Sequence, residues 1–280
     1  ECREELAQTI EEQIVRLQFE ELIFLPHLNE IEISCNKYQK NFFKVVEGDE
    51  VIIETKDLLD HNTEYSSWRL YKKIGTIRSE EGKDKSYEFI IAYDATGKKH
   101  GEVLYSYFKT DVKLQFPALI HGTFELTSDR NNLQKQSRIN HQLTQLLAKF
   151  MVETAVAISE EQKECSYAPL SLVITSDMDI VLKESYKLDA YLRDEVREKN
   201  ILPTIGNKYI SINQSPKYTS LLFADILDPD IFPELLKPTD DKVIRNYLQS
   251  ELGLRFYKYE EFCNRLNNHV QKYSLDERAE

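Results

Sequence analysis

The sequence predicts an α/β or α+β fold, in which a mixed sheet packed with helices is followed by a smaller helix-rich domain. Its 280 residues are enough for two ordinary domains. After an opening helical pattern, apolar residues occur in short runs typical of strands, and later at the spacing of three or four residues typical of helices. We therefore expect a lead-in helix over residues 1–26, a sheet domain over 27–160 and a helix-rich domain over 161–280.

The lead-in helix is predicted from an apolar stripe. Its members recur every three or four residues and are Leu6, Ile10, Ile14 and Leu17. The helix is expected to end near Pro26, because a residue that precedes proline disfavours helical angles. The chain begins inside this pattern and without Met, so we expect a further domain upstream of it.

Seven strands are predicted in the part of the chain that follows. They cover residues 31–34, 42–46, 51–55, 68–74, 87–93, 103–108 and 118–126. Turns are expected at Gly48, Gly82 and Gly97, because glycine accepts the backbone angles that tight turns need.

The helical pattern returns at Ser137, which is a plausible N-cap, and it continues as a long apolar stripe to Ile158. Beyond it, strands are predicted at 170–175 and 209–212. Helices are predicted at 180–199, 240–252 and 259–273, the second of them capped by Thr239 or Asp240.

Composition excludes several classes of function. The formal net charge of −12 argues against broad contact with nucleic acid or with an anionic membrane, because both need a basic face. The four cysteines are scattered, which suggests neither a disulfide framework nor a zinc site. No apolar run approaches the roughly 20 residues that span a bilayer. A cytoplasmic protein that does not contact membranes is therefore expected.

The polar loop at residues 127–132 stands out, because it connects a buried strand to the long helix. A guanidinium held there, together with the amide groups of a helix start, favours an anion such as phosphate. Arg130 is the candidate for this contact, with Ser128, Asn131 and Asn132 beside it. The alternative is that Arg130 pairs with Asp129 or a nearby carboxylate and that the small polar residues only cap the helix.

The segments 103–110 and 116–133 resemble bacterial sacsin-like ATPases, which are related to the heat shock protein 90 chaperones. Phe124, Leu126, Ser128 and Arg130 are similar to that family's phenylalanine-x-leucine-x-serine-x-arginine pattern. The resemblance implies the family's middle, or transducer, domain. It also implies that Arg130 reaches the γ-phosphate of ATP.

The same resemblance suggests a glutamine that assists Arg130, either Gln134 or Gln136. His121, near the motif, could touch phosphate, although a lone histidine in a strand is more often a packed residue. In the sacsin-like and heat shock protein 90-like ATPases, the nucleotide is held by a domain that precedes the middle domain.

The glycine-rich motifs that hold nucleotides are missing from the sequence. It has no aspartate-glycine-x-glycine turn, no Walker motif and no dinucleotide fingerprint. ATP, with Mg²⁺, is therefore expected to bind mainly in an upstream domain, and this chain is expected to be part of an ATPase that is inactive alone. Its partners would be that domain and a protein client or a second copy.

Two alternatives remain open. The chain could be a non-enzymatic interaction domain that binds a protein partner. It could also be a nucleic-acid-processing module, because Glu54-Thr55-Lys56 resembles the E-x-K strand of metal-dependent nucleases. The expected upstream aspartate is absent, however, and alternation places Glu54 and Lys56 on one solvated strand face.

Overall fold

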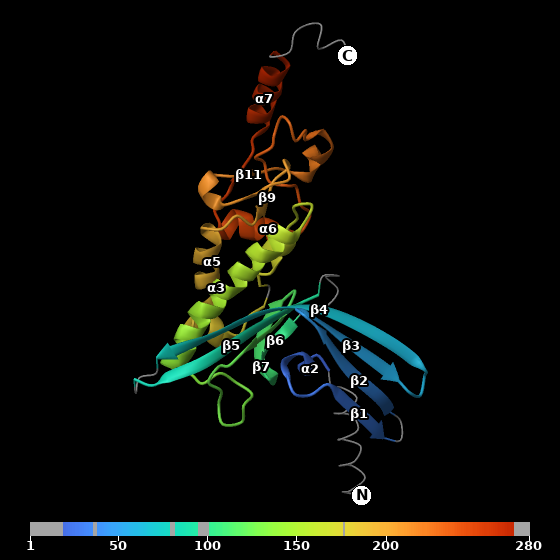
Figure 1. Cartoon of the computed structure of the whole chain (residues 1–280). Helices are drawn as coiled ribbons and strands as arrows, with labels where there is room; N and C mark the ends of the chain where they lie inside the picture. The colour runs from blue at the N-terminus through green and yellow to red at the C-terminus, as the bar shows by residue number, and fades with distance from the viewer. Residues whose placement is uncertain (1–18, 36–37, 79–81, 95–100, 176, 272–280) are drawn as a thin grey trace, which may run out of the picture. The chain divides into compact units, whose positions relative to one another are not determined.

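The computed structural model describes residues 19–35, 38–78, 82–94, 101–175 and 177–271 (Figure 1). It has the predicted mixed α+β fold with a large mixed sheet and helices. The chain divides into two compact units, Glu1–Leu143 with Asp177–Val181, and Thr144–Ser176 with Leu182–Glu280. The division falls within helix α3, Arg138–Glu161. Most of the predicted lead-in helix lies outside the described residues, which include its end as α2, Glu21–Phe24.

The first unit contains an eight-stranded sheet with the strand order β1-β2-β3-β4-β5-β8-β6-β7. Its neighbours pair antiparallel except β6 and β8, which pair in parallel. The strands are β1 Glu30–Cys35, β2 Tyr38–Glu47, β3 Glu50–Asp57, β4 Asn62–Arg78, β5 Asp84–Tyr93, β6 Gly101–Ser106, β7 Phe108–Phe116 and β8 Leu119–Gly122. Gly48 and Gly82 adopt the positive φ expected of turn glycines, and Gly97 lies outside the described residues.

Strand β7 was not predicted, and two predicted ends are wrong. The run 103–108 was expected to be one strand, but it turns at Tyr107, whose φ is 65°, and β7 begins at Phe108. In β7 the buried residues alternate with exposed charged and polar ones, so the strand contains no continuous apolar run. The strand predicted over 118–126 ends at Gly122, because the chain leaves the sheet there to form the polar loop.

Helix α2 covers one face of the sheet. Leu22, Ile23 and Phe24 are buried in one hydrophobic cluster with apolar residues of β2, β3 and β4, among them Trp68. Lys44 closes the end of this helix, because its Nζ donates to the carbonyl oxygens of Leu22 and Leu25 at 3.0 Å and 2.5 Å. A cation at a helix C-terminus is favourable. The lead-in segment therefore ends fixed to the sheet.

Gly122, the last residue of β8, is closely packed against aromatic rings. An added Cβ would lie 2.6 Å from Cε2 of Phe124 and 3.1 Å from Cδ1 of Phe89. We expect Gly122→Ala to lower the free energy of unfolding of the first unit by about 1–3 kcal/mol, the usual cost of overpacking. Urea unfolding followed by the fluorescence of Trp68, the single tryptophan, measures it. An unchanged midpoint would contradict this packing.

The second unit contains short helices and two-stranded sheets. Its elements after α3 are α4 Ala168–Ser171, a π-helical turn Val181–Ser185, α5 Leu188–Arg197, β9 Leu202–Pro203, β10 Tyr209–Ile210, the 3-10 turns Ile212–Gln214 and Leu221–Ile226, β11 Lys217–Tyr218, α6 Lys242–Asn246, a π-helical turn Tyr247–Glu251, β12 Arg255–Phe256 and α7 Tyr259–Gln271. A core cluster contains Phe232, Leu235, Tyr257 and Phe262.

Several predictions for this part of the chain need correction. The strand predicted at 170–175 is wrong: the chain forms α4, whose first turn contains Pro169, a residue suited to a helix start. The helix predicted over 180–199 is interrupted before α5 at Lys187, whose φ is 54°. Asp241, rather than Thr239 or Asp240, caps α6, because its carboxylate accepts the N–H groups of Val243 and Ile244.

Within the described ranges, no helix combines the length and the apolar character needed to cross a membrane.

Candidate functional site

The polar loop between β8 and α3 is closed at its base by the backbone. Leu126 and Leu133 form an antiparallel bridge, and the N–H of Gln134 donates to the carbonyl oxygen of Glu125 at 2.9 Å. Leu133 is 3% exposed, so this side chain fixes the returning strand of the loop in the core. The residues between the two leucines therefore form a short hairpin-like loop, called here the Arg130 loop (residues 127–132).

Hydrogen bonds inside the Arg130 loop hold its tip in one shape. The N–H of Thr127 donates to the carbonyl of Asn132 at 2.8 Å, and the N–H of Asn132 donates to the Thr127 hydroxyl at 3.2 Å. The Thr127 hydroxyl donates to Oδ1 of Asp129 at 2.5 Å, and the Asn131 N–H donates to the same oxygen at 3.1 Å. These two bonds lower the pKa of Asp129.

Arg130 lies at the tip of this loop and is exposed. Its φ is 61°, a left-handed conformation that costs energy for a residue other than glycine. Its N–H donates to the carbonyl of Thr127 at 2.8 Å, which closes the turn. The guanidinium forms no ion pair with any residue that the structure describes, and the carboxylate of Asp129 is bound by Thr127 and Asn131 instead. The alternative in which Arg130 pairs with Asp129 is therefore not observed.

The Arg130 loop is also bound to the edge of the sheet. The N–H of Asp111 in β7 donates to the carbonyl of Asn131 at 2.8 Å. This bond connects the loop to β7 as well as to β8, from which it emerges. A loop held from two strands and from within positions its arginine more rigidly than a free loop would.

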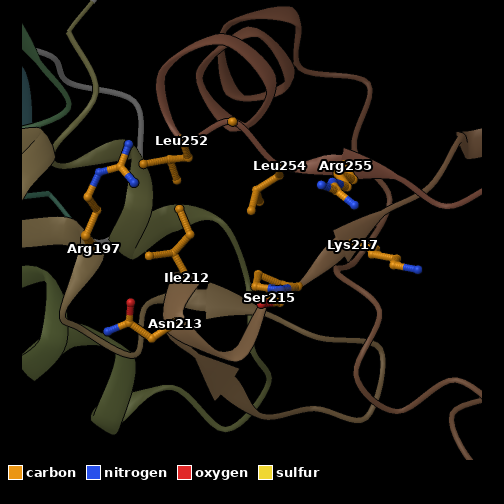
Figure 2. A pocket seen from close by; sticks show the side chains of 10 residues that line it. Arg197, Ile212, Asn213, Ser215, Lys217, Leu252, Leu254 and Arg255 are labelled. Atoms are coloured by element: carbon orange, nitrogen blue, oxygen red, sulfur yellow. The ribbon is translucent and has the colours of Figure 1, made fainter.

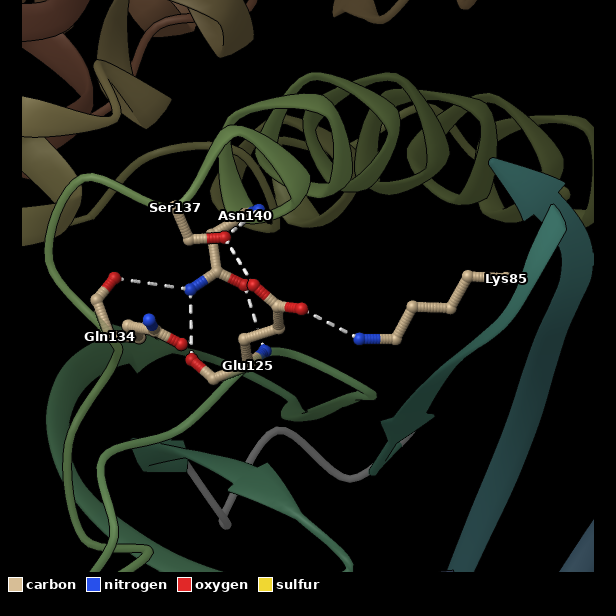
Figure 3. Close-up of polar contacts among 5 residues, drawn as sticks. All are labelled: Lys85, Glu125, Gln134, Ser137 and Asn140. Carbon is tan, nitrogen blue, oxygen red and sulfur yellow. Dashed lines mark hydrogen bonds and ion pairs between the residues drawn. The ribbon is translucent and has the colours of Figure 1, made fainter. Parts of the chain in front are cut away.

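A second set of contacts joins the base of the loop to the start of α3 (Figure 3). The buried amide of Asn140 bridges the main chain: its Oδ1 accepts the Glu125 N–H at 2.8 Å, and its Nδ2 donates to the carbonyls of Glu125 and Gln134 at 2.9 Å and 3.4 Å. Ser137 caps the helix as predicted, since its Oγ accepts the Asn140 N–H at 3.0 Å. The segments on both sides of the Arg130 loop are thus joined to α3 through one side chain.

Glu125 completes this junction. Its two carboxylate oxygens accept hydrogen bonds from the Ser137 hydroxyl at 2.6 Å and from Lys85 Nζ at 2.9 Å. Partial burial by itself would raise the pKa of Glu125, but the bonds from Ser137 and Lys85 and the lysine charge outweigh it, so the pKa lies below its ordinary value.

Because the folded-state pKa of Glu125 is depressed, the junction stabilises the fold above the ordinary carboxyl pKa and loses this stabilisation as pH falls through the folded value. We expect the urea midpoint reported by Trp68 to fall between pH 7 and pH 3, and the fall to be smaller in Glu125→Gln. The matched control is Glu88→Gln, which removes a carboxylate from strand β5. This variant should retain the full acid dependence. Equal acid dependence in the wild type and Glu125→Gln would refute this assignment.

The predicted site residues do not all lie together. Ser128, Asn131 and Asn132 are exposed on the same loop as Arg130. Gln134 and Gln136 are also exposed but follow the loop closure, and Gln136 has a φ of 63°. The loop therefore groups four of the predicted residues, with the two glutamines on the segment that leads to α3.

His121 belongs to the core instead. It is 0% exposed, it stacks on Phe24 with ring centroids 5.3 Å apart, and its Nδ1 accepts the N–H of Tyr107 at 3.0 Å. Burial lowers the pKa of His121 to about 4, so the ring is neutral at pH 7. A buried neutral ring has no surface to present to a phosphate. His121 is therefore the packed residue that the sequence offered as the alternative.

Glu54 and Lys56 lie on one partly solvated face of β3 and pair with each other, Nζ to Oε1, at 3.2 Å. Tyr65 of β4 donates to the same carboxylate oxygen of Glu54 at 3.0 Å. Among the residues the structure describes, no three histidine, cysteine, aspartate or glutamate side chains gather as metal ligands would.

Sequence reasoning missed Asn140 and Lys85. Asn140 carries a weak signal, because a buried asparagine three residues after a helix cap must satisfy its amide locally. Lys85 carries none, because it lies 40 residues from Glu125 and only the pairing of the strands brings it near.

The arrangement can offer an exposed positive charge, on a loop whose backbone is held by hydrogen bonds, to an anion in solution. It offers no activated nucleophile among the residues of the loop.

The chain matches no protein-family model, no curated protein and no solved structure.

Proposed function

We propose that this chain is the middle domain of a sacsin-like, heat shock protein 90-like ATPase. In this proposal Arg130 contacts the γ-phosphate of ATP that a preceding domain binds together with Mg²⁺. Phosphoryl transfer is accelerated mainly by positioning and by neutralising the charge of the γ-phosphate, and a guanidinium suits both tasks. The protein would act in the cytoplasm, with a protein client or a second copy as its downstream partner.

One observation carries this proposal: the exposed guanidinium of Arg130, without an ion pair among the described residues, on a loop held by Thr127, Asp129 and Asn132. An arginine whose charge is already neutralised would add little to a bound phosphate. An arginine on a floppy loop would lose entropy on binding. The exposed guanidinium and the ordered backbone of the Arg130 loop reduce both costs. The bond of Asn131 to β7, together with the bonds of Glu125 and Gln134 to Asn140 of α3, offers a route by which nucleotide binding could move the rest of the chain.

Hydrogen exchange tests the proposal in a protein that joins this chain to its proposed nucleotide-binding domain. A non-hydrolysable ATP analogue should slow exchange of the amides in the Arg130 loop by at least tenfold, and ADP should not, because only the former has a γ-phosphate. In the isolated chain neither nucleotide should have an effect. Equal exchange with both nucleotides in the joined protein would favour the interaction-domain alternative.

A further inference from the structure

A polar pocket of about 580 Å³ lies wholly within the second unit (Figure 2). Its wall includes the cations Arg197, Lys217 and Arg255 and the aliphatic residues Ile212, Leu252 and Leu254. The pocket is open to solvent and is built from α5, from the chain around β11 and from the chain around β12. Its residues play no part in the Arg130 loop.

The charge of this pocket is opposite to that of the chain. The chain has 48 acidic and 36 basic residues, so an arbitrary patch of its surface should contain more carboxylates than cations. The ten residues that line the pocket include three cations and no carboxylate. A concave surface lined by one sign of charge concentrates ligands of the opposite sign.

The two arginines retain their charge for a ligand. Arg255 forms no ion pair with any residue in the described part of the chain. Arg197 donates through Nη2 to the main-chain carbonyl of Glu251 at 3.1 Å, a neutral acceptor. The carboxylate of Glu251 is itself paired with Arg193.

Lys217 contributes less. Its Nζ is paired with the Glu261 carboxylate at 3.1 Å. Figure 2 shows it pointing away from the other labelled side chains. The positive charge of the pocket is therefore that of Arg197 and Arg255.

The backbone around Arg255 is held in place by tight turns. Lys217 and Arg255 are directly opposite each other in the parallel pair of β11 and β12. Each strand follows a residue with positive φ, Ser215 at 53° and Gly253 at 66°. Arg255 thus projects from a short strand whose position is determined by its partner.

The space between the two arginines is apolar. Figure 2 shows Ile212, Leu252 and Leu254 between Arg197 on one side and Arg255 on the other. Leu252 and Leu254 are 4% and 8% exposed, so their side chains are held in place by the packing around them. A ligand that fits must combine an anionic group with a nonpolar part.

We propose that this pocket binds a small organic phosphate. A guanidinium donates two parallel hydrogen bonds to phosphate oxygens, and the volume lies in the range of roughly 300–1,000 Å³ that holds whole small molecules. The phosphate would lie against Arg255, and the organic part would extend over Leu254, Leu252 and Ile212 toward Arg197.

Calorimetric titration of the 280-residue chain tests this site with four probes: n-hexyl phosphate, inorganic phosphate, hexanoate and hexanol. Hexyl phosphate is expected to bind at least tenfold more tightly than inorganic phosphate and than hexanoate, and hexanol is expected not to bind. Arg255→Gln should weaken hexyl phosphate at least tenfold. Arg78→Gln, which removes an exposed arginine of β4, is the matched control and should leave the affinity unchanged.

Far-UV circular dichroism confirms that each variant is folded before titration. The proposal is overturned if hexyl phosphate shows no saturable binding at millimolar concentration, or if Arg78→Gln weakens it as much as Arg255→Gln. Hexanoate that binds as tightly as hexyl phosphate would overturn the assignment to phosphates. None of these results depends on Arg130, so the two proposals fail separately.

Discussion

Replacing Arg130 by alanine is expected to lower ATP turnover by about 10³-fold in the protein that includes the proposed nucleotide-binding domain, the lower end of the range known for arginine fingers. The affinity for ATP should change by no more than about threefold, because an interaction made mainly in the transition state affects turnover more than binding. Single-turnover hydrolysis and nucleotide titration measure the two quantities.

Two further variants sharpen this test. Arg130→Lys keeps the charge but not the planar fork of donors, so its turnover should lie between those of the wild type and of the alanine variant. Lys135→Ala removes an exposed cation five residues along the chain and should change turnover by less than about twofold, as expected of a surface residue outside the site. Equal loss in Lys135→Ala and Arg130→Ala would mean that general charge, rather than the position of Arg130, determines the rate.

Replacing Asn140 by alanine is expected to lower the free energy of unfolding of the first unit by about 1–3 kcal/mol, the cost of a buried backbone group that loses its partner. The variant leaves the N–H of Glu125 without its partner, whereas the Glu125 carbonyl still accepts the N–H of Gln134. Trp68 is 1% exposed in the sheet core, so its fluorescence in urea reports on this unit.

Asn131→Ala is the matched control for Asn140, because the Asn131 side chain is exposed and only its backbone forms the bonds that hold the loop. Its free energy of unfolding should stay within about 0.5 kcal/mol of the wild type. If Asn140→Ala is no more destabilising than Asn131→Ala, then the strand-loop-helix junction is not what holds the loop.

The strands and the long helix followed from the sequence where apolar residues formed a clear pattern. Strand β7 did not, because its buried Val112, Leu114 and Phe116 alternate with exposed Lys113 and Gln115 and so give no apolar run. The run at 170–175 was apolar enough to suggest a strand, yet Pro169 starts a helical turn there. Local patterns predict elements, but proline and turn positions determine where they begin.

The candidate site, like the fold, could be predicted from the sequence only where the signal is local. Local sequence was enough to select Arg130 and its loop, because neighbouring residues build the loop. Contacts that join distant segments carried no such signal, as with Lys85 and Glu125 at the junction or Arg197 and Arg255 in the pocket of the second unit. These contacts can be identified only from the three-dimensional arrangement of the strands and helices.

The closest test of the central claim is to map where the γ-phosphate lies. ATP that carries a photoreactive aryl azide on its γ-phosphate can be crosslinked in the joined protein, and the modified peptides can be identified by mass spectrometry. We expect modification of residues 127–132, and its loss when unlabelled ATP competes. Crosslinks confined to the nucleotide-binding domain, with none in residues 127–132, would contradict the claim that Arg130 meets the γ-phosphate.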